Sequence, residues 1–306
     1  MQDNKKVLIT GAGGFIGSYL LRRFFLLNGI DVLGVTSKSV PYLEEELPCK
    51  LIQRDIMDKS ALLATMNAFQ PDYVLHFAAD ANGNAGGDAL VKNVEMTKNV
   101  LDTMPKSATL IFSSSITVYG DNTMANEQSP KTPTSLYGLS KCMCEDLIDL
   151  YRKNYGIRAM SLRLCATVGP DMTHGFIKDL LKKAKAPGDK LELFGNCPGT
   201  CKPYIHVRTI ESLIYDLITF RLPIIDAVNV SALDSLSVLE IANHVLERLD
   251  IKKEIVWGGN QTLWKGDNQR LWCDVTLLNQ MYQIYCRSMW AIDEVIKNMQ
   301  CYSYDS

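Results

Sequence analysis

The sequence predicts an α/β protein built on a doubly wound parallel sheet, followed by a smaller lobe. Three observations support this prediction. A glycine-rich turn near the start joins a short apolar run to a stretch with helical periodicity. Apolar runs and helical stretches then alternate as far as Pro170, as repeated βα units do. Beyond Pro170 the chain becomes irregular and rich in turn residues, which indicates a second unit.

The composition is that of an ordinary globular protein. The chain has 306 residues, of which 47% are hydrophobic and 22% charged, and its net charge is -2. This charge gives no general attraction to nucleic acid or to anionic membranes, so we expect neither as a partner. The polar start lacks the shape of a signal peptide, and no apolar run is long enough to span a membrane. We therefore expect a cytoplasmic protein.

The nine cysteines are scattered along the chain. Cys197 and Cys201 lie in a loop without the second pair that a zinc site needs. We therefore expect reduced thiols, as in the cytosol, and no metal site.

The first βα unit has the pattern of a dinucleotide-binding turn. Residues 5–10 form a short apolar strand, and residues 18–27 have helical periodicity. Glycines between them let the backbone approach a pyrophosphate, while the helix start offers free N–H groups and a positive dipole end. This predicts a sheet of the Rossmann type. The candidate cofactor-binding residues of the turn are Gly11, Gly14, Phe15, Ile16 and Gly17.

The end of the second strand, residues 30–35, bears on the choice of cofactor. An NAD-binding unit of this type places Asp or Glu there to hold the ribose 2′-hydroxyl. The chain has Thr36, Ser37 and Lys38 instead. Hydroxyls and a cation can bind a 2′-phosphate, and no carboxylate is present to repel it. We therefore expect NADP(H) in preference to NAD(H); the alternative is a polar loop that contacts no cofactor.

The following units continue the alternation. His76 has apolar neighbours, which favours a packed core histidine over a catalytic one. The glycine-rich loop at residues 82–87 is expected near the substrate. We expect strands at residues 50–54, 73–79, 109–112 and 157–164, and helices at residues 59–69, 90–104 and 137–154.

Candidate catalytic residues follow the fifth strand. Ser115 would lie at the carboxyl end of the sheet, where open α/β sheets bind ligands. Tyr137 and Lys141 are four residues apart on the next helix and therefore share one face. The ammonium favours the phenolate, so the tyrosine can exchange a proton with an alcohol oxygen that the serine also holds. Taken alone, the pair could equally be an exposed feature of an amphipathic helix.

The second lobe is expected to cap the edge of the sheet. Trp257, Trp264 and Trp272 lie in its irregular part and are expected to pack in the core. The predicted dinucleotide-binding domain spans residues 1–170, to which residues 204–230 return, and residues 171–203 and 231–306 form a substrate-binding lobe. We expect helices at residues 176–185, 210–220, 237–249 and 291–299, and strands at residues 204–207 and 227–230.

These motifs together resemble the extended short-chain dehydrogenase/reductases that act on nucleotide sugars, the group that contains UDP-galactose 4-epimerase. The resemblance runs from Lys6 to about Ile210. The markers, in family order, are Thr10-Gly11-x-x-Gly14-x-x-Gly17, Asp55-Ile56, His76-Phe77-Ala78-Ala79, Asn93, FSSSITVYG at residues 112–120, Tyr137-x-x-x-Lys141, Leu162-Arg163-Leu164 with Gly169-Pro170, and Tyr204-Ile205-His206-Val207.

The resemblance implies roles for the matching residues. Tyr137 would be the acid/base, Lys141 would hold the nicotinamide ribose, and Ser115 would bind the reacting oxygen. Asp55 and Ile56 would contact the adenine. The family is largely dimeric through a helix pair, here residues 90–104 and 137–154, so a homodimer is expected. The other residues expected along the cofactor are Phe77, Ala78, Ala79, Asn93, Ser113 and Cys165.

Departures from the family pattern narrow the chemistry. Dehydratases carry Asp-Glu where this chain has Ile116 and Thr117, so removal of water is not expected. The substrate-binding Asn of the family is Ala166 here, and the Arg before the Tyr-Ile-His-Val motif is Lys202. The expected substrate is a nucleotide-diphosphate sugar, contacted by Ser115, Ala166, Lys202 and Arg270, with Lys202 and Arg270 as candidates for the diphosphate.

Three functions fit these residues. The first is NADPH-dependent reduction of a nucleotide-linked 4-keto sugar, with hydride from the nicotinamide and a proton from Tyr137. The missing carboxylate at Thr36 favours it, because a reductase exchanges its cofactor and cells keep NADPH reduced. The second is 4-epimerisation with tightly held NAD. The third is a non-catalytic NADP-sensing protein on the same fold, against which the intact Ser115, Tyr137 and Lys141 argue.

Overall fold

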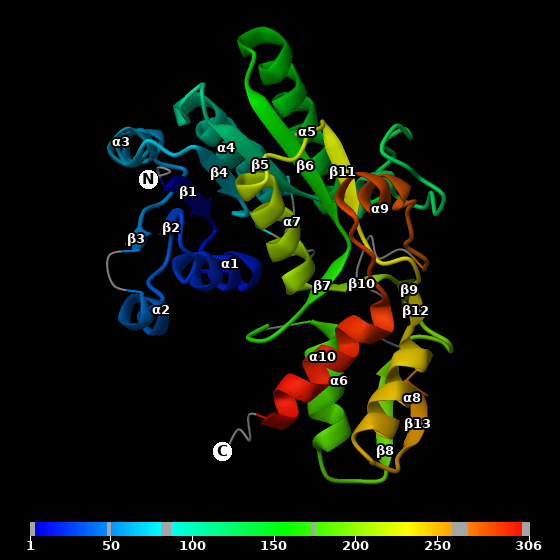
Figure 1. Ribbon diagram of the computed structural model, residues 1–306. Helices are drawn as coiled ribbons and strands as arrows, with labels where there is room; N and C mark the ends of the chain where they lie inside the picture. The colour runs from blue at the N-terminus through cyan, green and yellow to red at the C-terminus, as the bar shows by residue number, and fades with distance from the viewer. Residues whose placement is uncertain (1–3, 48–49, 81–86, 173–174, 259–268, 302–306) are drawn as a thin grey trace.

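The main sheet is parallel throughout the part of the chain that the structure describes, residues 4–47, 50–80, 87–172, 175–258 and 269–301. In this computed structural model its seven strands run in the order β11-β6-β5-β4-β1-β2-β3 (Figure 1). The predicted doubly wound α/β fold is thereby confirmed. The strands are β1 (Lys5–Thr10), β2 (Ile30–Thr36), β3 (Leu51–Gln53), β4 (Tyr73–His76), β5 (Thr109–Ser115), β6 (Arg158–Leu164) and β11 (Ala227–Val230).

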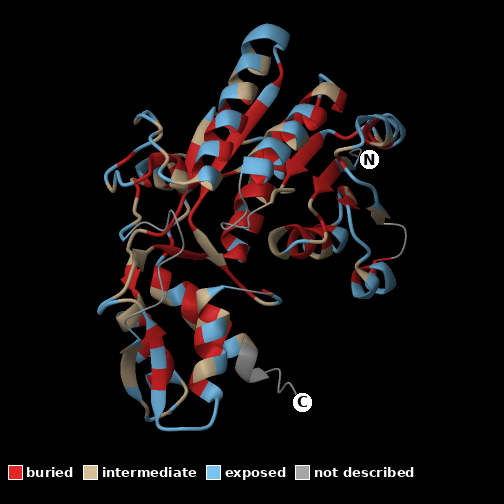
Figure 2. Ribbon diagram, turned by 180° about the vertical axis from the view of Figure 1, so that it is seen from behind, coloured by how far each residue is buried: buried red, intermediate tan, exposed pale blue. Residues whose placement is uncertain are grey.

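Alternate residues of each strand point to opposite faces of the sheet and fill two separate cores. On β1, Val7 and Ile9 join one core and Leu8 joins the other, and all three are fully buried. Helices α1 (Phe15–Phe25) and α7 (Val207–Thr219) cover the first core. Helices α3 (Lys59–Phe69), α4 (Gly87–Thr103) and α5 (Leu136–Tyr155) cover the second. Figure 2 shows these helices buried on one side and exposed on the other.

The strand order reverses at β1, and this reversal locates a ligand crevice. Strand β1 pairs with β2 as far as Thr10 opposite Val35, and with β4 as far as Thr10 opposite His76. Connections from these strands leave toward opposite sides of the sheet. A crevice therefore opens at their carboxyl ends, as in other open α/β sheets.

The smaller lobe combines short strand pairs with three helices (Figure 1). Strands β8 (Lys190–Phe194) and β13 (Glu254–Gly258) pair in parallel, whereas β9 (Cys201–Lys202) and β12 (Leu236–Ser237) pair antiparallel. Strands β7 (Ala166–Val168) and β10 (Tyr204–His206) form a third, parallel pair. Helices α6 (Phe176–Lys185), α8 (Val238–Arg248) and α10 (Ser288–Cys301) enclose a core of their own.

One late stretch of the chain packs beneath the main sheet. Helix α9 (Thr276–Tyr282) contacts β11, and Cys273, Leu278 and Cys286 are buried in the core that α1 and α7 cover. The predicted division assigned this stretch to the substrate lobe. No apolar periodicity in the sequence marks this packing, because the helix is short and irregular chain flanks it.

Several element boundaries differ from the prediction. Helix α1 begins at Phe15, since Gly14 is its N-cap, and β5 continues through Ser115 while β4 ends at His76. Trp257 packs against the core of the smaller lobe, whereas Trp272 is half-buried. Residues 82–86 of the predicted loop and Trp264 lie outside the described residues. The prediction missed α2 (Pro41–Glu46), the short 3-10 helix η1 (Ile116–Tyr119), and β7, β8, β9, β12, β13 and α9.

Two further properties concern membranes and thiols. Over the described residues, no helix combines the length and the apolarity needed to cross a bilayer. The cysteines that the structure describes are free thiols.

Candidate functional site

The glycine turn between β1 and α1 is packed too tightly for any side chain. A Cβ on Gly11, whose φ is +74°, would lie 2.5 Å from the Ala78 nitrogen, and one on Gly17 would lie 2.2 Å from the Gly11 carbonyl oxygen. Gly14 begins α1 without a side-chain cap. The first N–H groups of this 11-residue helix can therefore bind an anion such as a pyrophosphate.

A cavity of about 650 Å³ opens at this turn and collects most of the predicted cofactor-binding residues. Sequence reasoning missed five other residues that line it, Gly13, Arg54, Asp80, Lys92 and Met96. Phe15, Ile16 and Gly17 instead form the first turn of α1. The predicted residues that line the cavity are Gly11, Gly14, Thr36, Ser37, Lys38, Asp55, Ile56, Phe77, Ala78 and Ala79.

The rim of this cavity at the end of β2 is positively charged. Thr36 is buried, and its hydroxyl donates to the Lys38 carbonyl oxygen at 3.0 Å. Ser37 and Lys38 are exposed on the rim. Arg54 joins them from the neighbouring strand, because its backbone N–H donates to the Thr36 carbonyl oxygen at 2.8 Å.

Two predicted cofactor residues lie behind the cavity rather than on its wall. The Asn93 amide accepts from the Asp80 N–H at 2.7 Å and donates to the Asp80 carbonyl oxygen at 3.1 Å and to Ser140 Oγ at 3.2 Å. Asn93 is buried, so its contacts fix the chain that leaves β4. Cys165 follows β6, and burial raises the pKa of its thiol to about 12.

Lys141 lies beneath Tyr137 and is anchored to the strand that carries the serines. Its ammonium donates to the Ser113 carbonyl oxygen at 2.6 Å. The same Nζ lies 5.5 Å from the centre of the Tyr137 ring and 4.8 Å from that of Phe112, which is within cation–π range. Only 1% of Lys141 is exposed, so its charge acts at short range on these groups.

Ser115 is held so that its own proton remains available. Ser115 Oγ accepts the Thr117 backbone N–H at 3.2 Å and the Thr117 hydroxyl at 2.9 Å. These two donors fill the acceptor capacity of the serine oxygen, which leaves its O–H to donate elsewhere. A Cβ on Gly138 would lie 2.7 Å from the Thr117 carbonyl oxygen. Thr117 therefore contacts both Ser115 and the helix turn that carries Tyr137.

A buried ion pair supports the middle serine. Ser114 Oγ donates to Glu145 Oε1 at 2.6 Å, and Arg163 binds the same carboxylate through Nε at 3.0 Å and Nη2 at 2.8 Å. Burial by itself would raise the pKa of Glu145, but the hydrogen bonds and charge of Arg163 hold it below its usual value. Arg163 Nη1 also donates to the Tyr119 hydroxyl at 2.6 Å. Glu145 is one turn beyond Lys141, so α5 is fixed to β5 at two successive turns.

His76 is a packed core residue, as predicted. Only 1% of it is exposed, and its ring bonds the hydroxyls of Thr10 at 2.7 Å and Thr97 at 3.1 Å. Burial, helped by the charge of Lys141, lowers its pKa to about 3. The ring is therefore neutral at physiological pH.

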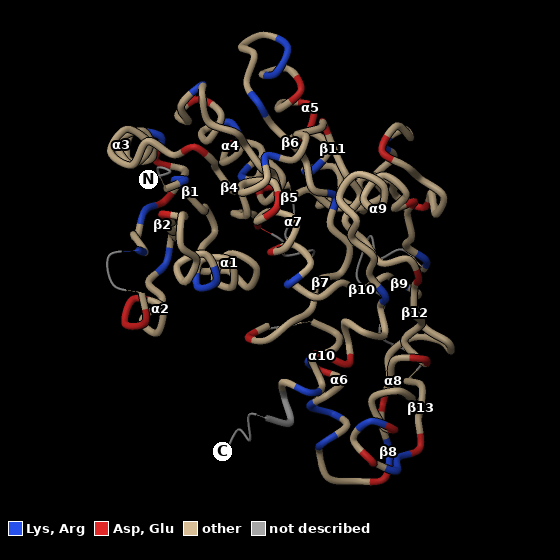
Figure 3. Tube along the Cα trace, viewed as in Figure 1, with Lys and Arg blue, Asp and Glu red and all other residues tan. Residues whose placement is uncertain are grey.

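A second cavity, of about 560 Å³, lies in the smaller lobe. Lys202 lines it, as do Tyr204 and the aromatic ring of Phe194, over which Lys183 Nζ lies at 4.0 Å. Figure 3 shows the basic residues along α6 and near β8 on this side of the molecule. The other predicted substrate residues lie close by in the pairing pattern: Ala166 pairs with Tyr204, and Arg270 bridges to Cys201.

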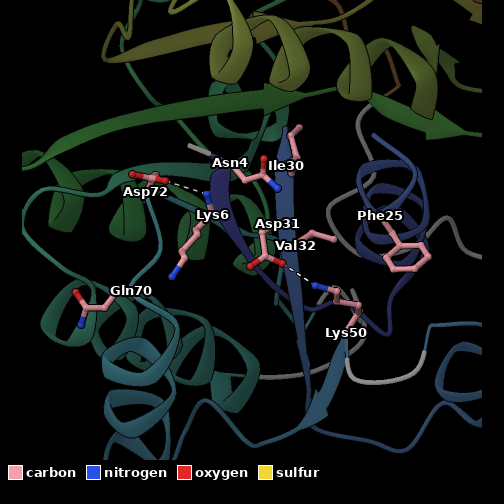
Figure 4. Close-up of a pocket in the computed structure, with 9 residues that line it drawn as sticks. All are labelled: Asn4, Lys6, Phe25, Ile30, Asp31, Val32, Lys50, Gln70 and Asp72. Atoms are coloured by element: carbon pink, nitrogen blue, oxygen red, sulfur yellow. Dashed lines mark hydrogen bonds and ion pairs between the residues drawn. The ribbon is translucent and has the colours of Figure 1, made fainter. Parts of the chain in front are cut away.

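A third hollow, of about 660 Å³, lies far from these residues at the amino ends of β1 and β2 (Figure 4). Its carboxylates are engaged, since Lys50 pairs with Asp31 at 2.6 Å and the Lys6 backbone N–H donates to Asp72 at 2.8 Å. None of the predicted site residues lines it. The carboxyl ends of the strands are therefore the candidate active site.

Comparisons with known proteins agree with this geometry. The family profile described as "NAD dependent epimerase/dehydratase family" matches residues 7–215. UDP-arabinose 4-epimerase 1 of Arabidopsis thaliana is 32% identical over 214 residues, which cover 64% of this chain but only 49% of that protein, about half its length. A dTDP-4-dehydro-6-deoxy-D-allose reductase of Streptomyces sp is 28% identical over 269 residues, covering 79% of this chain and 80% of that protein. A crystal structure of UDP-galactose 4-epimerase matches with a TM-score of 0.80 at 28% identity, covering 98% of this chain and 100% of that one.

Proposed function

Because the chain belongs to the NAD dependent epimerase/dehydratase family, the extended short-chain enzymes that are nucleotide-sugar oxidoreductases, we propose that it reduces a nucleotide-linked 4-keto sugar with NADPH. The observation that carries this choice is the rim of the cofactor cavity. Lys38 and Arg54 line it, and the residue at the end of β2 is Thr36 rather than the carboxylate that holds the 2′-hydroxyl of NAD. A cofactor that carries a phosphate there suits an enzyme that exchanges it after each turnover.

The residues at the end of β5 supply the proton and hold the reacting oxygen. A bound dihydronicotinamide supplies the hydride that adds to the carbonyl carbon. Tyr137 gives its phenolic proton to the carbonyl oxygen, so that a C=O bond becomes a CH–OH group. Lys141, fixed by the Ser113 carbonyl oxygen, stabilises the phenolate that remains. Ser115 donates its O–H to the same oxygen, because Thr117 already supplies two donors to Ser115 Oγ.

The cavity of the smaller lobe suits the nucleotide part of the substrate. Phe194 offers an aromatic face to a base, and Lys183 and Lys202 offer positive charge to a diphosphate. Arg270 lies beside the same strand through its bridge to Cys201. A substrate held there would extend its sugar toward the serines, with β7 and β10 lying between the two lobes (Figure 1).

Epimerisation at the same carbon is the second candidate. The likeness to UDP-galactose 4-epimerase over nearly the whole chain favours it, and the same three catalytic residues would serve oxidation as well as reduction. The two reactions differ in what happens to the cofactor. A reductase consumes it, whereas an epimerase returns it unchanged.

The test is a panel of 4-keto-6-deoxy sugars and of glucose and galactose, each linked to UDP, GDP, CDP or dTDP. The proposal expects NADPH absorbance to fall with at least one keto sugar in stoichiometric proportion to product. Inversion of a hexose without net change of cofactor would replace it with epimerisation. Specific binding of NADP(H) without turnover of any substrate would favour a sensor.

Tyr137→Phe tests the role of the phenol. We expect turnover to fall about 10²- to 10⁴-fold, because the general acid is lost while the ring stays in place. Tyr155→Phe, at the exposed end of the same helix, is the control and should keep full turnover. Equal turnover in wild type and Tyr137→Phe would contradict the mechanism.

The outer face of α5 supports a homodimer. Its exposed apolar residues, at 39–51% exposure, follow helical spacing on one side, and Val91 of the adjoining α4 is 59% exposed. Light scattering should give twice the chain mass, and replacing Leu139 and Met143 by Asp should give monomers. Leu63→Asp, on exposed α3, is the control. The residues of the stripe are Leu136, Leu139, Met143 and Leu150.

A further inference from the structure

We propose that Arg54, with Lys38 and Ser37, forms the binding site for the 2′-phosphate of an adenine dinucleotide. This site rests on the proposed use of NADP(H) and names the residues that select it. Arg54 is not part of the glycine turn and does not follow β2 in the sequence. It reaches the site only because β3 pairs with β2.

Strand pairing brings the two loops together. Thr36 pairs with Gln53 at the ends of β2 and β3, so Arg54 is the first residue beyond the pair. Its backbone N–H donates to the Thr36 carbonyl oxygen at 2.8 Å. From the other side, the Gln53 amide donates to the Ser37 carbonyl oxygen at 3.4 Å. These two bonds fix the chain at Ser37 against the chain at Arg54.

Thr36 shapes this loop and does not face the ligand. Its hydroxyl is buried, donates to the Lys38 carbonyl oxygen at 3.0 Å, and lies 2.6 Å from where a Cβ on Gly13 would be. The turn that this bond closes leaves Ser37 and Lys38 exposed on the cavity. The glycine turn lines the same cavity, so a dinucleotide whose pyrophosphate lies at α1 would bring its adenosine ribose to this rim.

The charges at the rim suit a phosphate rather than a hydroxyl. Arg54 Nη1 donates to the Gln53 carbonyl oxygen at 2.8 Å, which leaves other N–H groups of the guanidinium for a ligand. Among the ion pairs found within the described residues, none occupies Arg54 or Lys38. A phosphate monoester carries between one and two negative charges at neutral pH and accepts several hydrogen bonds, which a guanidinium and an ammonium can both supply.

Calorimetric binding of two small probes tests the site without turnover. The probes are adenosine 2′,5′-bisphosphate and adenosine 5′-monophosphate, which differ only in the 2′-phosphate. We expect the wild-type protein to bind the bisphosphate at least about tenfold more tightly at low salt, and the difference to shrink as salt is raised. Arg54→Gln and Lys38→Gln should each remove much of the difference, and the double variant all of it, with binding of the monophosphate unchanged.

Arg158→Gln is the matched control, because Arg158 is exposed at the opposite, amino end of β6. It should bind both probes as the wild type does. Equal binding of the two probes by the wild type would overturn the site and favour NAD, while leaving sugar-nucleotide turnover to be decided by its own assay. Equal losses for both probes in Arg54→Gln would also overturn it, since the residue would then act on the adenosine or on the fold. A full difference in affinity with no turnover of any sugar would keep the site and remove the reductase.

Discussion

The carboxyl end of β5 and the carboxyl ends of β2 and β3 belong to one sheet but are built in opposite ways. At β5, each residue of the serine triplet has its own buried partner. The Ser113 carbonyl oxygen accepts from Lys141, Ser114 donates to Glu145, and Ser115 accepts from Thr117. Each partner limits how far its serine can move.

At β2 and β3 the polar side chains face solvent instead. Ser37, Lys38 and Arg54 are exposed, and backbone bonds rather than buried side chains place them. A change of residue there alters the charge offered to a ligand without leaving a buried group unpaired.

The difference follows from what each region must do. Proton transfer needs the phenol and the serine at fixed distances from one oxygen, so the catalytic end is held by a network in which every polar group is satisfied. Discrimination between cofactors needs only a charge near one ribose, which long flexible side chains can supply. The predictions below break or sharpen this contrast, from the largest expected effect to the smallest.

Breaking the buried ion pair should cost the most stability. In Arg163→Met, Glu145 would remain buried without its partner, and we expect the free energy of unfolding to fall by about 3–5 kcal/mol. Denaturant unfolding at neutral pH measures this. The exposed Arg158→Met is the control and should change stability by less than about 0.5 kcal/mol. Equal effects in the two variants would show that the pair does not hold β5 to α5.

The same variant should also be more sensitive to acid. Arg163 holds the pKa of Glu145 below its unfolded value, against the effect of burial. A lowered carboxyl pKa stabilises the fold above the unfolded pKa, and this stability is lost as the pH falls through the folded value. Without Arg163 the folded pKa rises, so the acid unfolding midpoint should move to higher pH.

His76 should make the whole fold lose stability in mild acid. Burial lowers its folded pKa to about 3, so the unfolded chain binds a proton near pH 6.5 that the folded chain refuses. Stability is therefore full above about pH 6.5 and declines as the pH falls toward 3, by about 2 kcal/mol between pH 7 and pH 5. Urea unfolding at the two pH values measures it, and His76→Asn should flatten the decline. An equally steep decline in His76→Asn would assign it to other groups.

Removing one hydroxyl next to Ser115 should slow the reaction without unfolding the protein. Thr117→Val keeps the branched shape but loses the donor to Ser115 Oγ. We expect kcat to fall about tenfold with KM nearly unchanged, and Thr117→Ser to restore it. In a Ser115→Ala background, Thr117→Val should have no further effect, because it acts through that serine. Additive losses would contradict this role, and Thr65→Val in α3 is the control.

The smallest effect is expected on stability at the rim. Arg54→Gln and Lys38→Gln should each change the free energy of unfolding by less than about 0.5 kcal/mol, because both side chains are exposed. Thermal and urea unfolding measure it. A loss of several kcal/mol would mean that the rim is part of the structural framework, and the contrast with β5 would fail.

Sequence reasoning predicted the catalytic end better than the rim. Tyr137 and Lys141 are four residues apart on one helix, and periodicity alone places them on one face. Lys38 was predicted because it directly follows β2. Arg54 was missed, since its proximity to Thr36 depends on how β3 pairs with β2 and not on local pattern.

The sequence by itself determined the features that repeat over a few residues: the parallel sheet, the glycine turn whose backbone approach excludes a Cβ, and the spacing of Tyr137 and Lys141. The tertiary structure alone decided which distant residues meet. Glu145 reaches Ser114, Arg54 reaches the end of β2, and α9 packs beneath β11. The physical reason is that periodicity and turn chemistry act along the chain, whereas strand register and helix packing bring together residues that no local pattern relates.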